Sequence, residues 1–105
     1  MADYYDKQGK PIDDVQYVRL KSDVSYWRVA HDKVADSEIS TVWLGYISPV
    51  YRMFRAELLP LFETMVFSGP LEDERVQYAT LEQAQAGHAA MVARVHALRA
   101  TQTQA

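Results

Sequence analysis

The stretch RVQYATLEQAQAGHAAMVARVHALR, residues 75–99, changes its hydrophobic period part-way along and so decides the fold class. Apolar and polar residues alternate from Arg75 to Tyr78, which is the period of a strand. Thr80 and Gln83 then form the capping-box pattern that opens a helix. From there to about Arg99, one helical face carries Leu81, Ala84, His88, Met91, Val92, Val95 and Leu98. The stretch therefore predicts a strand followed by one long C-terminal helix.

Upstream of this point, four segments carry strand signals and are separated by turn residues. Each is rich in β-branched and aromatic residues, which is typical of an antiparallel meander. The predicted strands cover residues 15–20, 24–34, 37–45 and 61–67, and 75–78 is the fifth. We predict an α+β fold: an antiparallel β-meander of about five strands with one long C-terminal helix on one face, and a short helix or long loop at about 46–60.

The chain has 105 residues, which is enough for one hydrophobic core but hardly for two. Residues 1–14 are polar and contain Gly9 and Pro11, so we expect a flexible N-terminal arm there. The predicted single domain covers residues 15–100, and residues 101–105 are expected to fray.

Composition argues against several classes of partner. The net charge is −3, from 14 acidic and 11 basic side chains that are evenly mixed, so no basic stripe is available to bind nucleic acid. The absence of cysteine excludes disulfides, thiolate metal sites and a cysteine nucleophile, and it suits a reducing cytosol. No signal-peptide pattern and no apolar run of membrane-spanning length occur, so we expect a soluble intracellular protein without a membrane partner.

No residue pattern predicts a catalytic centre, a metal site or a cofactor. The three histidines lack the spacing of convergent metal ligands. Glu63 is the most unusual charge, because it lies between Leu61 and Met65 on an apolar strand and must find a partner there. One interpretation is an ion pair with Arg19 or Arg28, or a face that is less buried than it looks. The other is a general base or a ligand-binding acid.

The strand over residues 61–67 is apolar on both faces, whereas a single helix can cover only one face of a sheet. Phe62 and Val66 lie on one side, and Met65 and Phe67 lie on the other. Aromatic residues of the earlier strands also divide between the faces: Tyr17, Tyr26, Trp27 and Trp43. Something is therefore expected to cover the second face: residues 45–60, a second copy of the chain, or a partner protein.

Residues 46–60 are the best candidate for a binding segment. Apolar residues recur at helical spacing before Pro60, which favours a short amphipathic helix over the sheet, and the alternative is a long projecting hairpin tip. Tyrosine and arginine are the residue types that anchor protein interfaces. The predicted binding residues are Tyr46, Tyr51, Arg52, Phe54, Arg55 and Glu63.

Three motifs carry a resemblance to a known family. They are STVWLG at 40–45, FETMVF followed by a Gly-Pro-Leu turn at 62–71, and Ala-Gly-His at 86–88. Over residues 28–95 the chain resembles a family of small uncharacterised proteins encoded by tailed bacteriophages and prophages. It departs from that pattern at Ala35-Asp36, where members have Gly-Asp, and at 46–60, where members carry a polar loop.

The resemblance implies a phage-encoded accessory protein that acts by protein–protein binding in the host cytoplasm. The partner would be a host or phage protein, and modulation of a host process or a defence system is one subtype. The alternative is a homo-oligomeric structural or assembly protein of the phage, such as a homodimer. A third hypothesis, an enzyme or small-molecule binder that uses Glu63, has the weakest support. The resemblance supplies no catalytic residues.

Overall fold

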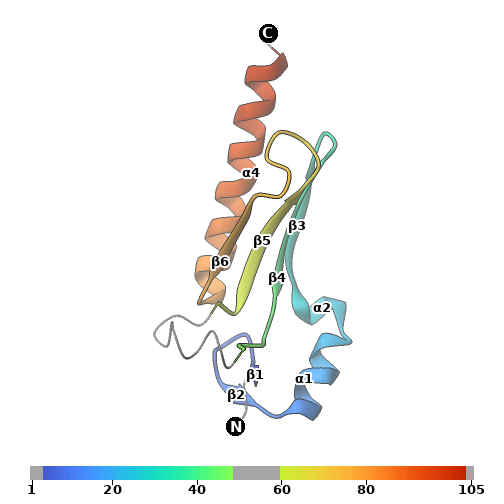
Figure 1. Cartoon of the computed structure of the whole chain (residues 1–105), viewed down its shortest axis with the longest axis vertical. Helices are drawn as coiled ribbons and strands as arrows, with labels where there is room; N and C mark the ends of the chain where they lie inside the picture. Colours follow the sequence, from blue (N-terminus) through green and yellow to red (C-terminus); the bar gives the residue numbers. More distant parts are fainter. Residues whose placement is uncertain (1–3, 49–59, 104–105) are drawn as a thin grey trace.

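The computed structural model describes residues 4–48 and 60–103, which form a four-stranded antiparallel sheet with a long helix on one face (Figure 1). The strands are β3 (Arg28–Val34), β4 (Ser37–Trp43), β5 (Phe62–Phe67) and β6 (Arg75–Tyr78), and they lie in the order β3-β4-β5-β6. The helix is α4 (Leu81–Thr103). The predicted α+β class, the last three strands and the C-terminal helix are confirmed.

The predicted strand over residues 15–20 is wrong, because these residues form helix α1 (Asp14–Lys21). Asp13 starts this helix: its carboxylate accepts a hydrogen bond from the Gln16 amide at 2.8 Å, and the Gln16 side chain accepts one from the Asp13 amide at 3.2 Å. The first four residues of the predicted strand at 24–34 are also helical, as α2 (Val24–Trp27). Among the residues that the structure describes, the meander therefore has four strands, and the two short helices precede it.

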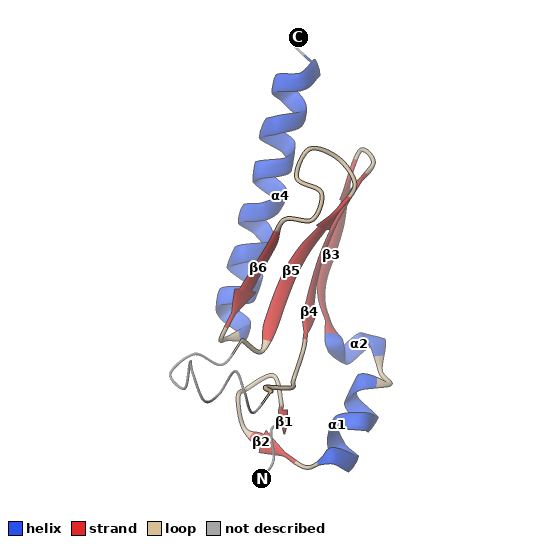
Figure 2. Cartoon of the chain, in the orientation of Figure 1, coloured by secondary structure: helices blue, strands red, loops and turns tan. Residues whose placement is uncertain are grey.

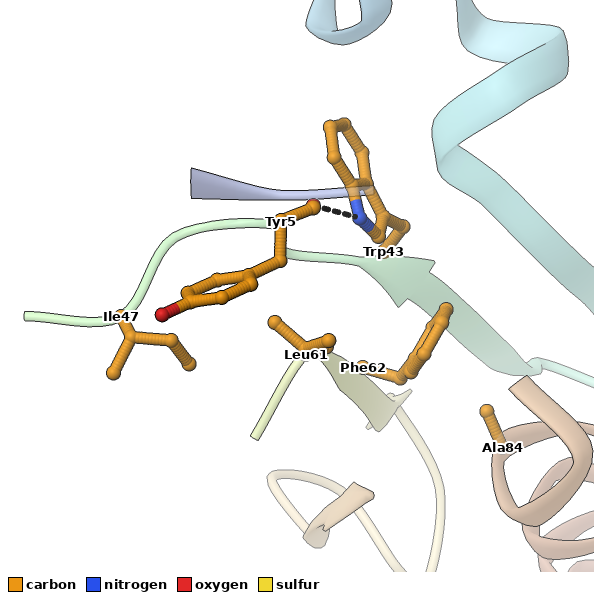
Figure 3. Close-up of a cluster of buried hydrophobic side chains, with 6 residues drawn as sticks. All are labelled: Tyr5, Trp43, Ile47, Leu61, Phe62 and Ala84. Carbon is orange, nitrogen blue, oxygen red and sulfur yellow. Dashed lines mark hydrogen bonds between the residues drawn. The ribbon is translucent and has the colours of Figure 1, made fainter. Parts of the chain in front are cut away.

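Residues 4–12 form a hairpin, where the sequence predicts a flexible arm. Strand β1 (Tyr4–Tyr5) pairs antiparallel with β2 (Pro11–Ile12). The hairpin lies with α1 and α2 beyond the end of the sheet at which β3 begins (Figure 2). Tyr5 is buried, and its carbonyl accepts a hydrogen bond from the Trp43 indole at 3.0 Å (Figure 3). The hairpin is thus part of the core.

The described part of the chain forms two hydrophobic core clusters. The first surrounds Trp43 and also contains Tyr5, Ile47, Leu61, Phe62 and Ala84 (Figure 3). Tyr17, Tyr26 and Trp27 pack against this same cluster. The prediction that the aromatic residues divide between the two faces of the sheet is therefore wrong. The second cluster lies farther along α4 and consists of Val34, Ile39, Val66, Met91 and Val95.

Helix α4 begins with the predicted capping box. The Thr80 hydroxyl accepts from the Gln83 amide at 3.1 Å, and the Gln83 side chain accepts from the Thr80 amide at 3.3 Å. Near the other end, Arg99 pairs with Asp36 and donates to the Ser37 hydroxyl at 3.1 Å. Gly87 leaves room for Tyr78 of β6, because a Cβ at Gly87 would overlap the tyrosine ring and hydroxyl. Both ends of the helix–sheet contact are therefore held by side chains.

Candidate functional site

Two of the six predicted binding residues lie within the described residues. Tyr46 follows β4, is 44% exposed, and forms an isolated β-bridge with Tyr4. Glu63 lies on β5. The other predicted binding residues, and the short helix or loop predicted with them, lie outside the described residues; they are Tyr51, Arg52, Phe54 and Arg55.

Glu63 projects from the face of the sheet opposite α4. Its carboxylate accepts a hydrogen bond from the Gln77 side chain at 3.2 Å, and Gln77 is its direct neighbour on β6. Arg28 is two strands away, because Val42 lies between it and Glu63 in the register. The contacts support the interpretation of a partly exposed face on which Glu63 finds a polar neighbour.

The face opposite α4, which we call the outer face, is mostly polar. Along β4 the residues alternate between buried ones under α4 and partly exposed ones on the outer face. From the strand register, the outer face carries Arg28, His31 and Lys33 of β3, Glu38, Ser40 and Val42 of β4, Glu63, Met65 and Phe67 of β5, and Arg75 and Gln77 of β6. The prediction of a bare aromatic face that must be covered is therefore wrong.

The aromatic residues gather instead beyond one end of the sheet. We call this region the aromatic end and define it as Tyr4, Tyr17, Tyr26, Trp43 and Tyr46 together with helices α1 and α2. Tyr4 stacks on Tyr17 with ring centroids 4.3 Å apart, and Tyr46 lies 5.4 Å from Tyr4. Tyr26 meets Trp43 edge-on at 5.0 Å. Tyr17 lies 5.7 Å from Trp43, again between ring centroids, so all five rings are connected through ring-to-ring contacts.

Electrostatics at the aromatic end reflect partial burial. Burial raises the pKa of Tyr17, and the neighbouring hydroxyls of Tyr4 and Tyr46 raise it further. Burial also lowers the pKa of Lys21, whose ammonium donates to the Trp43 carbonyl at 3.0 Å and lies 5.3 Å from the Trp43 ring centroid. Both shifts disfavour the charged form of the side chain, as expected where water is partly excluded.

Exposed apolar side chains concentrate at the same end. Val15 and Val18 of α1 are 74% and 62% exposed, and Val24 of α2 is 48% exposed. With Tyr46, they make up four of the six large apolar or aromatic side chains that are exposed among the described residues. Tyr17 and Leu20 turn the opposite side of α1 toward the core. Helix α1 thus has apolar residues on both its inner and its outer side.

A second cluster, which the sequence did not predict, is a series of buried polar side chains linked by hydrogen bonds. The Thr64 and Thr41 hydroxyls are hydrogen-bonded to each other, and Thr41 Oγ1 lies 2.7 Å from His88 Nδ1. His88 Nε2 lies 2.7 Å from the Asp32 carboxylate. In a neutral imidazole, Nε2 then donates to Asp32 and Nδ1 accepts from Thr41. In the sequence, the one sign of this cluster is that His88 is a polar residue on the apolar face of the predicted helix.

The chain of hydrogen bonds resembles a nucleophile–histidine–acid arrangement, but its position is unsuitable for catalysis. Thr41 and Thr64 are completely buried, so neither hydroxyl is within reach of a substrate. The Thr41–His88 and His88–Asp32 hydrogen bonds cross the helix–sheet contact, and Thr64 bonds to Thr41 within the sheet. The arrangement therefore satisfies polar groups inside the core, which is what buried polar side chains require.

Two further features bear on ligand binding. A hollow of about 490 Å³ opens between the β1–β2 turn and the start of α4, and its described lining includes neither Tyr46 nor Glu63. Within residues 4–48 and 60–103, no three histidine, cysteine, aspartate or glutamate side chains gather closely enough to hold a metal ion. No helix in this described part of the chain has the length and apolar character needed to cross a membrane.

Comparison with protein-family models, with curated proteins and with solved structures finds no match to this chain.

Proposed function

We propose that the protein acts by binding another protein through its aromatic end. The observation that supports this most directly is the exposure of Val15 and Val18 on α1. Removing a valine side chain from water contributes about 1.5 kcal/mol or more, so two of them at i and i+3 on one helix give a partner a strong apolar contact. Val24 and Tyr46 add exposed apolar surface at the same end of the molecule.

The resemblance to phage and prophage proteins supports a narrower form of the proposal. The protein would be a phage-encoded accessory factor in the host cytoplasm, and its partner would be a host or phage protein. Interference with a host process or a defence system would be one use of such binding. Tyr46 belongs to the predicted binding set and lies at the aromatic end, so the sequence-based hypothesis and the exposed valines point to the same region.

The charge layout of the outer face weakens the alternative of a homodimer formed through that face. Its acids, Glu38 and Glu63, lie on the two inner strands, and its bases include Arg28 and Lys33 on one edge strand and Arg75 on the other. A two-fold face-to-face pairing with aligned strands sets edge strand against edge strand. Bases would then oppose bases, which destabilises an interface.

The test compares charge substitutions at two exposed positions with a matched substitution elsewhere. The double variant Val15→Asp/Val18→Asp places carboxylates on the outer side of α1, where both side chains are already in water, so folding should be preserved. Leu98→Asp, on the 38% exposed Leu98 of α4, is the control. Partners recovered with the wild type are identified by mass spectrometry, and the most enriched one is purified and titrated against all three proteins.

We expect the double variant to bind the purified partner at least tenfold more weakly, because each carboxylate would have to lose its water against an apolar contact. The Leu98→Asp control should bind like the wild type. Unchanged affinity of the double variant would refute the proposal. Sedimentation of the wild type distinguishes self-association: a dimer that Val15→Asp/Val18→Asp dissociates would make the second copy the partner.

A further inference from the structure

Strand β3 forms an open edge of the sheet. Within residues 4–48 and 60–103 it pairs only with β4, and the two are joined by the two-residue turn Ala35-Asp36. The pair that closes such a turn, Val34 and Ser37, is hydrogen-bonded, and hydrogen-bonded and non-hydrogen-bonded pairs then alternate along the ladder. Lys33 and His31 belong to the non-hydrogen-bonded pairs, so their amides and carbonyls point away from β4.

The same alternation is visible on the other side of β4. The Leu44 amide donates to the Leu61 carbonyl at 2.7 Å, so the hydrogen-bonded pairs between β4 and β5 fall at every second residue from Leu44. These are the β4 residues that do not bond to β3, as an unbroken sheet requires. Among the described residues, no other segment forms backbone hydrogen bonds to His31 or Lys33. The edge therefore offers two amides and two carbonyls to an added strand.

The side chains that β3 presents on the outer face are all basic: Arg28, His31 and Lys33. All three are exposed. Glu38 of β4 lies opposite Lys33 in the register, with its carboxylate 4.0 Å from His31 Nε2. The other exposed charge of β3, Asp32, lies on the α4 side and is bound to His88. A strand added beside β3 would therefore meet a row of bases on the outer face.

We propose that the β3 edge binds an extended acidic segment of a partner protein as a fifth strand. Backbone hydrogen bonds to His31 and Lys33 would align the segment, and carboxylates at every second residue would lie beside the bases of β3. Strand addition of this kind is a recurring mode of peptide recognition, in which the backbone gives affinity and alternate side chains give specificity. Opposite charges across neighbouring strands stabilise the pairing.

A second copy of β3 fits this edge poorly. Antiparallel pairing of two β3 strands through the open amides sets His31 or Lys33 of one copy opposite His31 or Lys33 of the other. Like charges directly opposite each other destabilise strand pairs. Exposed lysine on an edge strand is also a known protection against self-pairing. An acidic strand would be attracted by the same basic side chains that repel a second copy of β3.

The experiment uses a blocked nonapeptide, Thr-Glu-Val-Glu-Val-Glu-Val-Glu-Thr, and the same peptide with lysine in place of glutamate. Each is titrated into the ¹⁵N-labelled full chain, and amide shifts and hydrogen exchange are followed by NMR. We expect the glutamate peptide to protect the His31 and Lys33 amides and the lysine peptide to leave them unchanged. Absence of protection at these two amides would overturn the proposal.

Charge reversals locate the contact. Arg28→Glu/Lys33→Glu should weaken binding of the glutamate peptide between about 2-fold and about 30-fold. Arg75→Glu, on the opposite edge strand, should leave binding unchanged, and an equal loss there would mean general attraction and refute the edge site. Lys33→Gln removes the charge without reversing it, so it serves as a second test variant if Arg28→Glu/Lys33→Glu fails to fold. Val15→Asp/Val18→Asp should bind the peptide normally, so failure of the aromatic-end proposal and failure of this one are distinguishable.

Discussion

Gly87→Ala should destabilise the protein in the wild-type background and stabilise it once Tyr78 is removed. Glycine inside a helix costs about 1 kcal/mol relative to alanine, so the substitution alone would be expected to stabilise α4. In the folded protein, however, the new Cβ would overlap Tyr78. Tyr78 is partly buried and packs against the Trp43 cluster, so its ring cannot move away without losing packing.

The size of the effect follows from two opposing terms. Overpacking of this kind typically destabilises the fold by about 1–3 kcal/mol, whereas the higher helix propensity of alanine stabilises it by about 1 kcal/mol. We expect Gly87→Ala to destabilise the wild type by about 1 kcal/mol, which corresponds to a fall in Tm of about 4–8 °C for a domain of this size. In a Tyr78→Ala background the overlap is absent, and the same substitution should stabilise by about 1 kcal/mol.

The assay is a double-mutant cycle measured by urea unfolding with circular dichroism. The four proteins are the wild type, the two single variants and the double variant, and the expected interaction energy is about 2 kcal/mol, within the range for residues in contact. Ala90→Gly, at an exposed position of α4, measures the propensity term alone and should cost about 1 kcal/mol in both backgrounds. Stabilisation of the wild type by Gly87→Ala, or an equal effect in both backgrounds, would refute the reasoning.

Three further predictions test other features. Ala35 has a φ of 55°, which is unfavourable for a residue with a Cβ, so Ala35→Gly should stabilise the protein by about 0.5–1 kcal/mol in thermal unfolding; a lower Tm would contradict this. Thr41→Val leaves His88 Nδ1 without its hydrogen-bond partner inside the core and should cost about 1–3 kcal/mol in urea unfolding; a neutral effect would mean that the chain of hydrogen bonds adds no stability. Because the folded-state pKa of Tyr17 is raised, its contribution to stability is present below pH 10 and is lost as the pH rises through the folded pKa. The stability difference between wild type and Tyr17→Phe should therefore be constant from pH 7 to 9 and shift against the wild type above pH 10, and a pH-independent difference would contradict the burial of this phenol.

The sheet and the long helix were predictable because their signals agree at every level. Strand β5 combines β-branched and aromatic residues with a turn on its C-terminal side, and α4 combines an apolar face with a capping box at Thr80 and Gln83. Propensity, pattern and capping therefore gave the same answer, which is the condition under which sequence reasoning is most reliable.

Helix α1 was missed because two local signals conflict. Val15 and Val18 favour a strand by propensity, and the residues between them alternate. The capping box of Asp13 and Gln16 favours a helix, and Tyr17 and Leu20 then pack toward Trp43. The same motif that located α4 was present here too. The packing of Tyr17 and Leu20 against the core favours the helix, and this places Val15 and Val18 on its exposed side.

The candidate site was only partly predictable. Tyr46 was identified by residue type, and its exposure fits a binding role. The exposed valines of α1 were assigned to a strand, so their position on the surface was unforeseen. The partners of His88 lie 47 and 56 residues away in the sequence, and only the pairing of the strands brings Thr41 and Asp32 to it.

The buried chain from Thr64 to Asp32 has a consequence for how the molecule reaches its native state. Thr41 and Thr64 face His88 only when β4 and β5 pair as they do here, because a slip of one residue turns every side chain of a strand to the opposite face. A one-residue slip of β4 would turn Thr41 away from His88 and remove this hydrogen bond inside the core, at a cost of about 1–3 kcal/mol. These hydrogen bonds form on docking of α4 only when β3, β4 and β5 are aligned as observed. A misaligned sheet would lack these hydrogen bonds, so they favour the native register over a slipped one during folding.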